Sequence, residues 1–171
     1  WALYDFANSA FSAIIVATIF PVYYTEVVVG NRDGRGDFWW GLASSLSMVL
    51  VAAAAPILGG VADHAGVRKA FLIGFTLASV AATALLATVG PGMLAWGFTL
   101  IVIGVVAFES ACVYYNSYLT RITTADSMGR TSALGFAVGY AGSLVAFAVA
   151  YPVVPAGADH ASFVAAARQP E

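Results

Sequence analysis

Charged side chains are scarce in this chain, and their scarcity argues against whole classes of protein. Asp, Glu, Lys and Arg make up 9% of the residues, whereas soluble domains carry about 25%. No charge occurs from Phe38 to Ala62 or from Ala70 to Phe108. We therefore do not expect a water-soluble globule. The net charge of −2 gives no argument for nucleic-acid binding, which usually shows a basic patch.

Cysteine, histidine and cofactor motifs are equally sparse. The one cysteine, Cys112, cannot form an internal disulfide, and His64 and His160 are too few for a metal site. The loop at residues 30–37 contains Asn31, Asp33 and Asp37, but it lacks the spacing of a calcium loop. No phosphate-binding loop is visible. We expect no metal and no cofactor.

Long apolar runs are the dominant feature of the sequence. Hydrophobic residues make up 61% of the chain, and a helix needs about 20 of them to cross the hydrocarbon layer, which is about 30 Å thick. Open sheet edges cannot exist in lipid. The predicted fold class is all-α, a polytopic transmembrane bundle. Charge-free lengths and Gly/Pro punctuation predict five spans, at about residues 6–29, 38–62, 70–89, 93–118 and 132–154.

The domain organisation follows from these spans. Residues 1–158 are predicted to form one transmembrane bundle, and residues 159–171 a polar loop that leads to a sixth span. Because the chain starts at Trp1 without a methionine, we expect it to be a fragment. Orientation is set by basic residues in loops, which favour the cytoplasm. The loops after the second and fourth spans are predicted to be cytoplasmic, since they hold Arg68, Lys69, Arg121 and Arg130 against Arg32, Arg35 and Arg168 on the other side.

Small residues recur at helical spacing in the predicted fifth span. Gly135, Gly139 and Ser143 are four residues apart, and Gly142 adds a second line. Small side chains let helix backbones approach closely in lipid. No strand precedes these glycines, so a dinucleotide-binding turn is not indicated. They are predicted to pack against a neighbouring helix.

A short charged turn joins the second and third predicted spans, at Gly59–Lys69 (GGVADHAGVRK). Gly59 permits a close helix approach, and Asp63 can accept hydrogen bonds at the membrane edge. Gly66 permits a tight reversal, and Arg68 and Lys69 anchor the next span. Any polytopic loop needs a turn and basic anchors, so a purely structural role stays open.

This turn resembles the signature loop of the major facilitator superfamily (MFS), Gly-x-x-x-Asp-x-x-Gly followed by basic residues. Gly59, Asp63, Gly66, Arg68 and Lys69 match it. Two positions depart from it: His64 stands where Arg or Lys is common, and Val67 delays the basic pair by one residue. The resemblance implies that Asp63 and the basic pair form an inner gate between two halves of a transporter.

Further segments resemble the vacuole-effluxer-like branch of that superfamily. The resemblance implies a whole protein of about twelve spans, of which this chain would hold most of the N-terminal half, with the C-terminal half as its partner. In that family the fungal members are vacuolar amino-acid effluxers and the bacterial members are largely uncharacterised carriers, so the resemblance implies efflux of a small solute such as an amino acid, across the vacuolar membrane of a fungus or the inner membrane of a bacterium. The matching segments are Trp1–Phe11 (WALYDFANSAF), Phe20–Tyr24 (FPVYY), Tyr115–Leu119 (YNSYL) and Met128–Tyr140 (MGRTSALGFAVGY).

Glu109 is the ionisable residue placed deepest inside a predicted span. A carboxyl at this depth is costly and usually faces protein or a water-filled cavity. Asn116 lies seven residues later, on the same helix face. We expect Glu109 and Asn116 to line a substrate or coupling pathway. A structural carboxyl bonded to a neighbouring helix is the alternative.

Polar residues at both ends of the first span allow two interpretations. Asp5 and Asn8 are expected to cap the helix, although the family resemblance places them on the pathway. Tyr23 and Tyr24 with Glu26 are expected to form an outer aromatic belt.

Tyr140 lies in the predicted fifth span. It offers a hydroxyl to a substrate or to a neighbouring helix.

These features predict a secondary transporter that moves a small molecule across a lipid bilayer by alternating access. A scaffold or receptor built on the same helices without turnover is the alternative. An intramembrane enzyme is not expected, because the sequence offers no nucleophile–base pair and no metal ligand set.

Overall fold

The computed structural model describes residues 1–65 and 67–150, apart from the side chains of residues 61–65 and 120. Five helical stretches within this part are long and apolar enough to cross a membrane, and none of its residues lies in a strand. The all-α transmembrane fold class is therefore confirmed. The five stretches are Ala2–Val29, Arg32–Gly60, Arg68–Leu86, Leu94–Leu119 and Met128–Ala150. The predicted end of the fifth span at Val154 and the polar segment 159–171 lie outside the described residues.

The first span is an irregular helix. It consists of α1 (Ala2–Phe11), the π-helical η1 (Ser12–Thr18), α2 (Ile19–Val22) and the π-helical η2 (Tyr23–Val29). Pro21 explains part of the irregularity, because it has no N–H to offer the carbonyl one turn earlier and its ring crowds that carbonyl. The Thr18 hydroxyl donates to the carbonyl of Ala13 at 2.6 Å. The two π-helical segments thus flank the short α-helical segment that contains Pro21, and the first of them contains the bond from Thr18 to the backbone.

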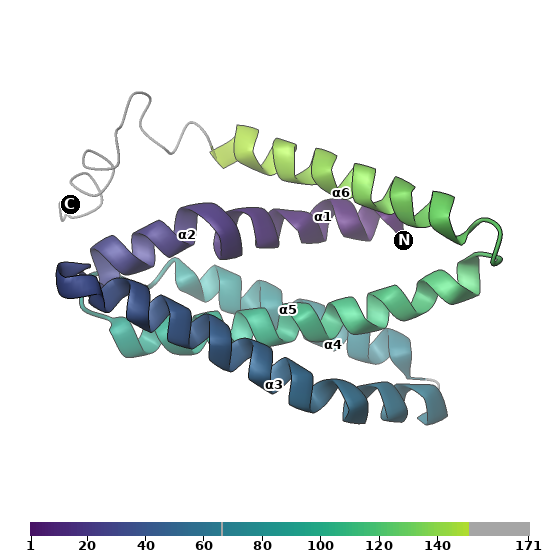
Figure 1. Ribbon diagram of the computed structural model, residues 1–171, viewed down its shortest axis with the longest axis horizontal. Helices are drawn as coiled ribbons and strands as arrows, with labels where there is room; N and C mark the ends of the chain where they lie inside the picture. Colours follow the sequence, from purple (N-terminus) through teal and green to yellow (C-terminus); the bar gives the residue numbers. More distant parts are fainter. Residues whose placement is uncertain (66, 151–171) are drawn as a thin grey trace.

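The other spans are regular α-helices: α3 (Arg35–Ala65), α4 (Arg68–Leu86), α5 (Leu94–Ile122) and α6 (Met128–Ala150). In Figure 1, α6 runs along α1, while α3, α4 and α5 lie together on the other side of α1. Helix α5 packs against both α3 and α4. The described bundle therefore has two parts, α1 with α6 and α3 with α4 and α5, and α1 lies between α6 and the other three helices.

One end of the bundle is closed by an aromatic and aliphatic cluster that joins the first span to the α4–α5 turn. The Tyr23 hydroxyl donates to the carbonyl of Val89 at 2.7 Å, and the Tyr24 hydroxyl to that of Leu94 at 3.2 Å. A Cβ on Gly97 would lie 2.8 Å from the Tyr24 ring, so glycine is required there. Tyr24 is fully buried. Its assignment to an outer aromatic belt is therefore wrong, because its ring fills the core and does not face lipid.

Both loops at the ends of α3 are shorter than the sequence suggests. Helix α3 continues to Ala65 and α4 begins at Arg68, so most of Gly59–Lys69 is helical and its assignment to a turn is corrected. No helix-breaking residue stands between Gly60 and Ala65, which allows the helix to continue. At the other end, η3 (Arg32–Gly34) leads directly into α3.

Candidate functional site

The contact between α1 and α6 is made by glycines. A Cβ on Gly135 would lie 2.5 Å from the Trp1 ring, and one on Gly142 would overlap the backbone carbonyl of Phe6. A Cβ on Gly139 would lie 2.6 Å from the Ser9 hydroxyl and 2.7 Å from the Asp5 carboxylate. Because these three positions of α6 carry no side chain, α1 can come close to the α6 backbone.

A small polar cavity of about 230 Å³ lies between α1, α5 and α6. Several of its lining residues belong to the start of α1, the end of α5 and the start of α6, which lie at the end of the bundle that holds the N-terminus (Figure 1). Among its lining residues, Asp5 is the one with a formally charged side chain. The lining residues are Trp1, Asp5, Asn8, Ser9, Ser12, Phe108, Cys112, Tyr115, Asn116, Leu119, Ser132 and Phe136.

Asn8 connects α1 to α5 at this cavity. Its amide nitrogen Nδ2 is 3.3 Å from Sγ of Cys112 and donates to it. The expectation that Asn8 caps its own helix is therefore wrong, because Asn8 lies well inside α1 (Ala2–Phe11) and its side chain bonds to another span. The Trp1 indole Nε1 makes a second link, since it donates to the carbonyl of Tyr115 at 3.4 Å.

Tyr115 is the most unusual polar residue of the cavity. Its ring stacks on Trp1 and on Tyr4, with centroid distances of 4.8 and 4.9 Å. The residue is 6% exposed. Its hydroxyl is buried and has no hydrogen-bond partner among the residues that the structure describes. A buried polar atom without a partner is rare and costly, so this hydroxyl requires an explanation.

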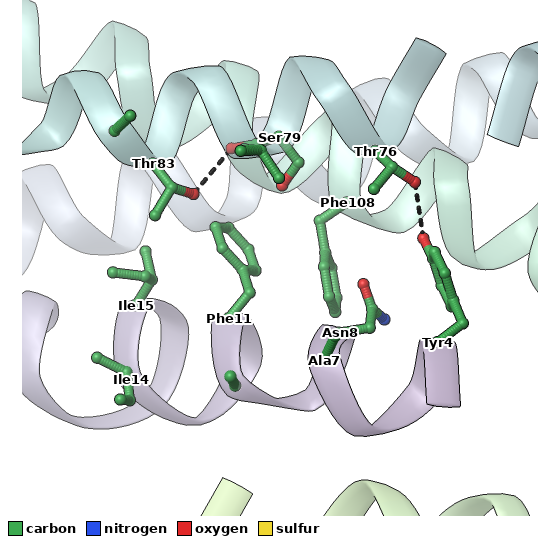
Figure 2. A pocket seen from close by; sticks show the side chains of 13 residues that line it. Tyr4, Ala7, Asn8, Phe11, Ile14, Ile15, Thr76, Ser79, Thr83 and Phe108 are labelled. Atoms are coloured by element: carbon green, nitrogen blue, oxygen red, sulfur yellow. Dashed lines mark hydrogen bonds between the residues drawn. The ribbon is translucent and has the colours of Figure 1, made fainter. Parts of the chain in front are cut away.

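A second, larger cavity of about 550 Å³ lies between α1 and α4 (Figure 2). Phe11 and Phe108 project into it, and most of its lining is aliphatic or aromatic. Its polar groups are mainly hydroxyls, including a 2.9 Å hydrogen bond between Tyr4 and Thr76. No lining residue is charged. The smaller cavity therefore offers the stronger chemistry for recognising a polar solute, although Asn8 borders both.

The predicted pathway residues are not all brought together. Asp5, Asn8 and Asn116 line the polar cavity. Glu109 is partly buried on α5, one helical turn before Cys112, and does not belong to the lining. Tyr140 is 73% exposed on α6 and also lies outside the cavity.

The predicted gate residues lie at the α3–α4 junction. Nothing described lies within 4 Å of a Cβ built on Gly59. Arg68 is partly buried at the start of α4, and Lys69 beside it is exposed. The side chain of Asp63 and the whole of Gly66 lie outside the described residues.

Sequence reasoning missed the place of Cys112 in the cavity lining, and that of two serines of the first span, Ser9 in α1 and Ser12 in η1. A signal for Cys112 was available, because it lies four residues before Asn116 and therefore shares its helix face. In residues 1–65 and 67–150, no group of three His, Cys, Asp or Glu side chains could hold a metal ion.

Comparison with known proteins agrees with a membrane transporter. Residues 41–131, just over half of the chain, match the family described as vacuole effluxer Atg22 like. The uncharacterized MFS-type transporter YxiO of Bacillus subtilis (strain 168) is 32% identical over 156 residues, which are 90% of this chain and 36% of that protein. An uncharacterized protein of Aquifex aeolicus (strain VF5) is 30% identical over 151 residues, 85% of this chain and 36% of that protein.

No solved structure matches the chain, and the chain spans about a third (36%) of the length of the curated relatives it matches. The described helices and the family match establish a multi-pass membrane protein. The chain belongs to the vacuole effluxer Atg22-like family of MFS-type transporters, which are not enzymes.

Proposed function

We propose that the complete protein is a secondary active transporter that moves a small solute by alternating access. The observation that carries this proposal is the family match, which covers residues 41–131. The polar cavity supports it, since transporters of this kind place their binding sites between spans and inside the bilayer. The remaining two thirds of the protein, including a second half-bundle, would complete the pathway.

Amino acids are the proposed solutes, and efflux is the proposed direction. The description of the matching family, vacuole effluxer Atg22 like, supports efflux, and the family resemblance suggests amino acids. The membrane would be the inner membrane of a bacterium or the vacuolar membrane of a fungus. The polar cavity is compatible with such solutes, because it offers a carboxylate, amides and hydroxyls within about 230 Å³.

The α3–α4 junction is the proposed inner gate. Asp63 would accept hydrogen bonds from the second half when the cavity opens outward, with Gly59, Gly66, Arg68 and Lys69 shaping the contact. Asp63→Ala should then shift the full-length protein toward inward-open forms, which raises the labelling of Cys112 in the cavity from the cytoplasmic side. Unaltered labelling would count against a latch at Asp63.

Counterflow tests the proposed activity. Full-length protein is reconstituted into liposomes loaded with unlabelled amino acids, and uptake of labelled amino acids and small metabolites is measured one at a time. At least one labelled solute should accumulate transiently and saturably above protein-free liposomes. A scaffold or receptor would exchange none of them.

A further inference from the structure

The polar cavity between α1, α5 and α6 is rich in hydrogen-bond acceptors. Asp5 contributes a carboxylate, and Ser9 and Asn116 contribute a hydroxyl and an amide. No Lys or Arg belongs to the lining. An anion would therefore meet a like charge with no compensating cation, whereas a cation would find a counter-ion. The charge of the cavity selects the sign of its ligand.

The Tyr115 hydroxyl gives an independent reason to expect a ligand. Only 6% of the surface of Tyr115 is exposed. Tyr115 lines the same cavity as Asp5. No described residue accepts or donates a hydrogen bond at this oxygen. Because buried polar atoms are almost always paired, the missing partner is expected to be a molecule that enters the cavity.

We infer that Asp5 and the Tyr115 hydroxyl bind a small monovalent cation in this cavity. The inference rests on the proposed transport function, and it names the group recognised at that site. Two sources share this chemistry: the ammonium group of the transported solute and a coupling sodium ion. In either case the Asp5 carboxylate supplies the charge, and the Tyr115 oxygen supplies a lone pair.

The stacking around Tyr115 suits this role. Trp1 and Tyr4 hold its ring in a defined orientation at centroid distances of 4.8 and 4.9 Å. The hydroxyl is thus positioned before the ligand arrives, which reduces the entropy lost on binding. Asn8 contributes to the same arrangement, because its hydrogen bond to Cys112 at 3.3 Å ties α1 to α5 beside Asp5.

The test measures cation binding by thermal unfolding of the purified full-length protein. Methylammonium chloride is titrated in one arm and sodium chloride in the other, with choline chloride holding the ionic strength constant. At least one probe should raise the unfolding midpoint of the wild-type protein. A response to methylammonium assigns the site to an ammonium group of the solute, and a response to sodium alone assigns it to a coupling ion.

Three variants make the test specific. Asp5→Asn and Tyr115→Phe should each weaken the apparent affinity about tenfold or more, the range expected for a lost hydrogen bond to a charged group. Tyr114→Phe is the matched control, because it removes a neighbouring phenol oxygen that is already bonded to Leu58. It should leave the affinity unchanged. The inference is overturned if neither probe shifts the wild type, or if either Asp5→Asn or Tyr115→Phe keeps the wild-type affinity, as a structural water at Tyr115 would predict.

The counterflow assay separates this inference from the proposed function. Solute exchange without cation binding would leave the transporter proposal standing and remove the cation site. Cation binding without exchange of any solute would remove the transporter proposal and leave the cation site standing. The two failures therefore have different signatures in the same protein preparation.

Discussion

Tyr114 and Tyr115 are adjacent on α5 and both are buried, yet only the Tyr114 hydroxyl is hydrogen bonded within the described chain. Tyr114 donates to the carbonyl of Leu58 on α3 at 2.9 Å, and its ring stacks on Phe71 and Phe75 of α4. Tyr115 faces α1 and its hydroxyl has no described partner. Successive residues on a helix point about 100° apart, so the two tyrosine side chains lie on different sides of α5.

This difference predicts opposite effects on stability. Tyr114→Phe should lower the free energy of unfolding by about 0.5–1.5 kcal/mol, because it removes an interhelical hydrogen bond. Tyr115→Phe should leave it unchanged or raise it, because it removes a buried oxygen that no described residue pairs. Thermal unfolding of the full-length protein without added ligand measures both. Equal losses in the two variants would mean that the Tyr115 oxygen has a permanent partner.

Gly142 should not tolerate a methyl group. A Cβ at this position would overlap the backbone carbonyl of Phe6, and backbone cannot move aside as a flexible side chain can. Gly142→Ala should therefore cost about 1–3 kcal/mol of stability through overpacking. Gly74→Ala is the control, since nothing described lies within 4 Å of its Cβ. Similar unfolding midpoints for the two variants would show that α1 and α6 are less closely packed than the structure indicates.

Asn31 should stabilise the start of α3. Its side-chain oxygen accepts hydrogen bonds from the backbone N–H groups of Gly36 and Asp37 at 3.1 and 3.3 Å. Its amide nitrogen donates to Glu26 at 3.2 Å, which ties the end of the first span to α3. Asn31→Ala should cost about 1 kcal/mol, the usual effect of losing a cap, as measured by thermal unfolding. Arg32→Ala, at an exposed neighbouring position, should have little effect, and a loss as large as that of Asn31→Ala would argue against capping.

Cys112 should report on access to the polar cavity. Its thiol lines the cavity and accepts a hydrogen bond from Asn8 at 3.3 Å. Asn8→Ala removes this bond and opens space beside the sulfur, so alkylation of Cys112 by N-ethylmaleimide should become severalfold faster. Mass spectrometry of the modified full-length protein measures the rate, and Cys112→Ser identifies the modified site. An unchanged rate would mean that Asn8 does not shield the thiol.

Glu109 should contribute to energy coupling if the proposed pathway is correct. It is a partly buried carboxyl inside the fourth span, and such groups commonly serve as proton carriers. Glu109→Gln should weaken uptake driven by a pH gradient in proteoliposomes, while counterflow without a gradient should persist. Glu26→Gln, at the end of the first span, is the control. Unchanged gradient dependence in Glu109→Gln would remove this residue from coupling.

Several features could be predicted from the sequence because they depend on length and on local chemistry. The charge-free runs match the thickness of a bilayer, which predicts five helical spans and excludes a strand-based fold. The Gly135, Gly139 and Gly142 spacing predicts one close helix contact. The resemblance of Gly59–Lys69 and of four further segments to a transporter family predicts the family that the comparison establishes.

Other features could not be predicted, because apolar spans carry little information about which face meets protein and which meets lipid. Tyr24 was expected in an interfacial belt, and it is buried in the core. Asn8 was expected as a cap, and it bonds to Cys112. The π-helical turns of the first span were not expected either, since Pro21 alone does not show how far the irregularity extends.

The sequence by itself determined how many helices cross the membrane, since burying backbone in lipid requires helices of a set length. It also determined the family, through motifs that are local in the chain. Only the tertiary structure decided which polar residues line one cavity: Asp5, Asn8, Cys112 and Tyr115 come from two spans about one hundred residues apart, and Asn8 bonds to Cys112. Lipid is as apolar as a leucine-rich interface, so hydrophobicity cannot select these neighbours. Close packing of α1 against α6, and of its aromatic rings against α5, selects them.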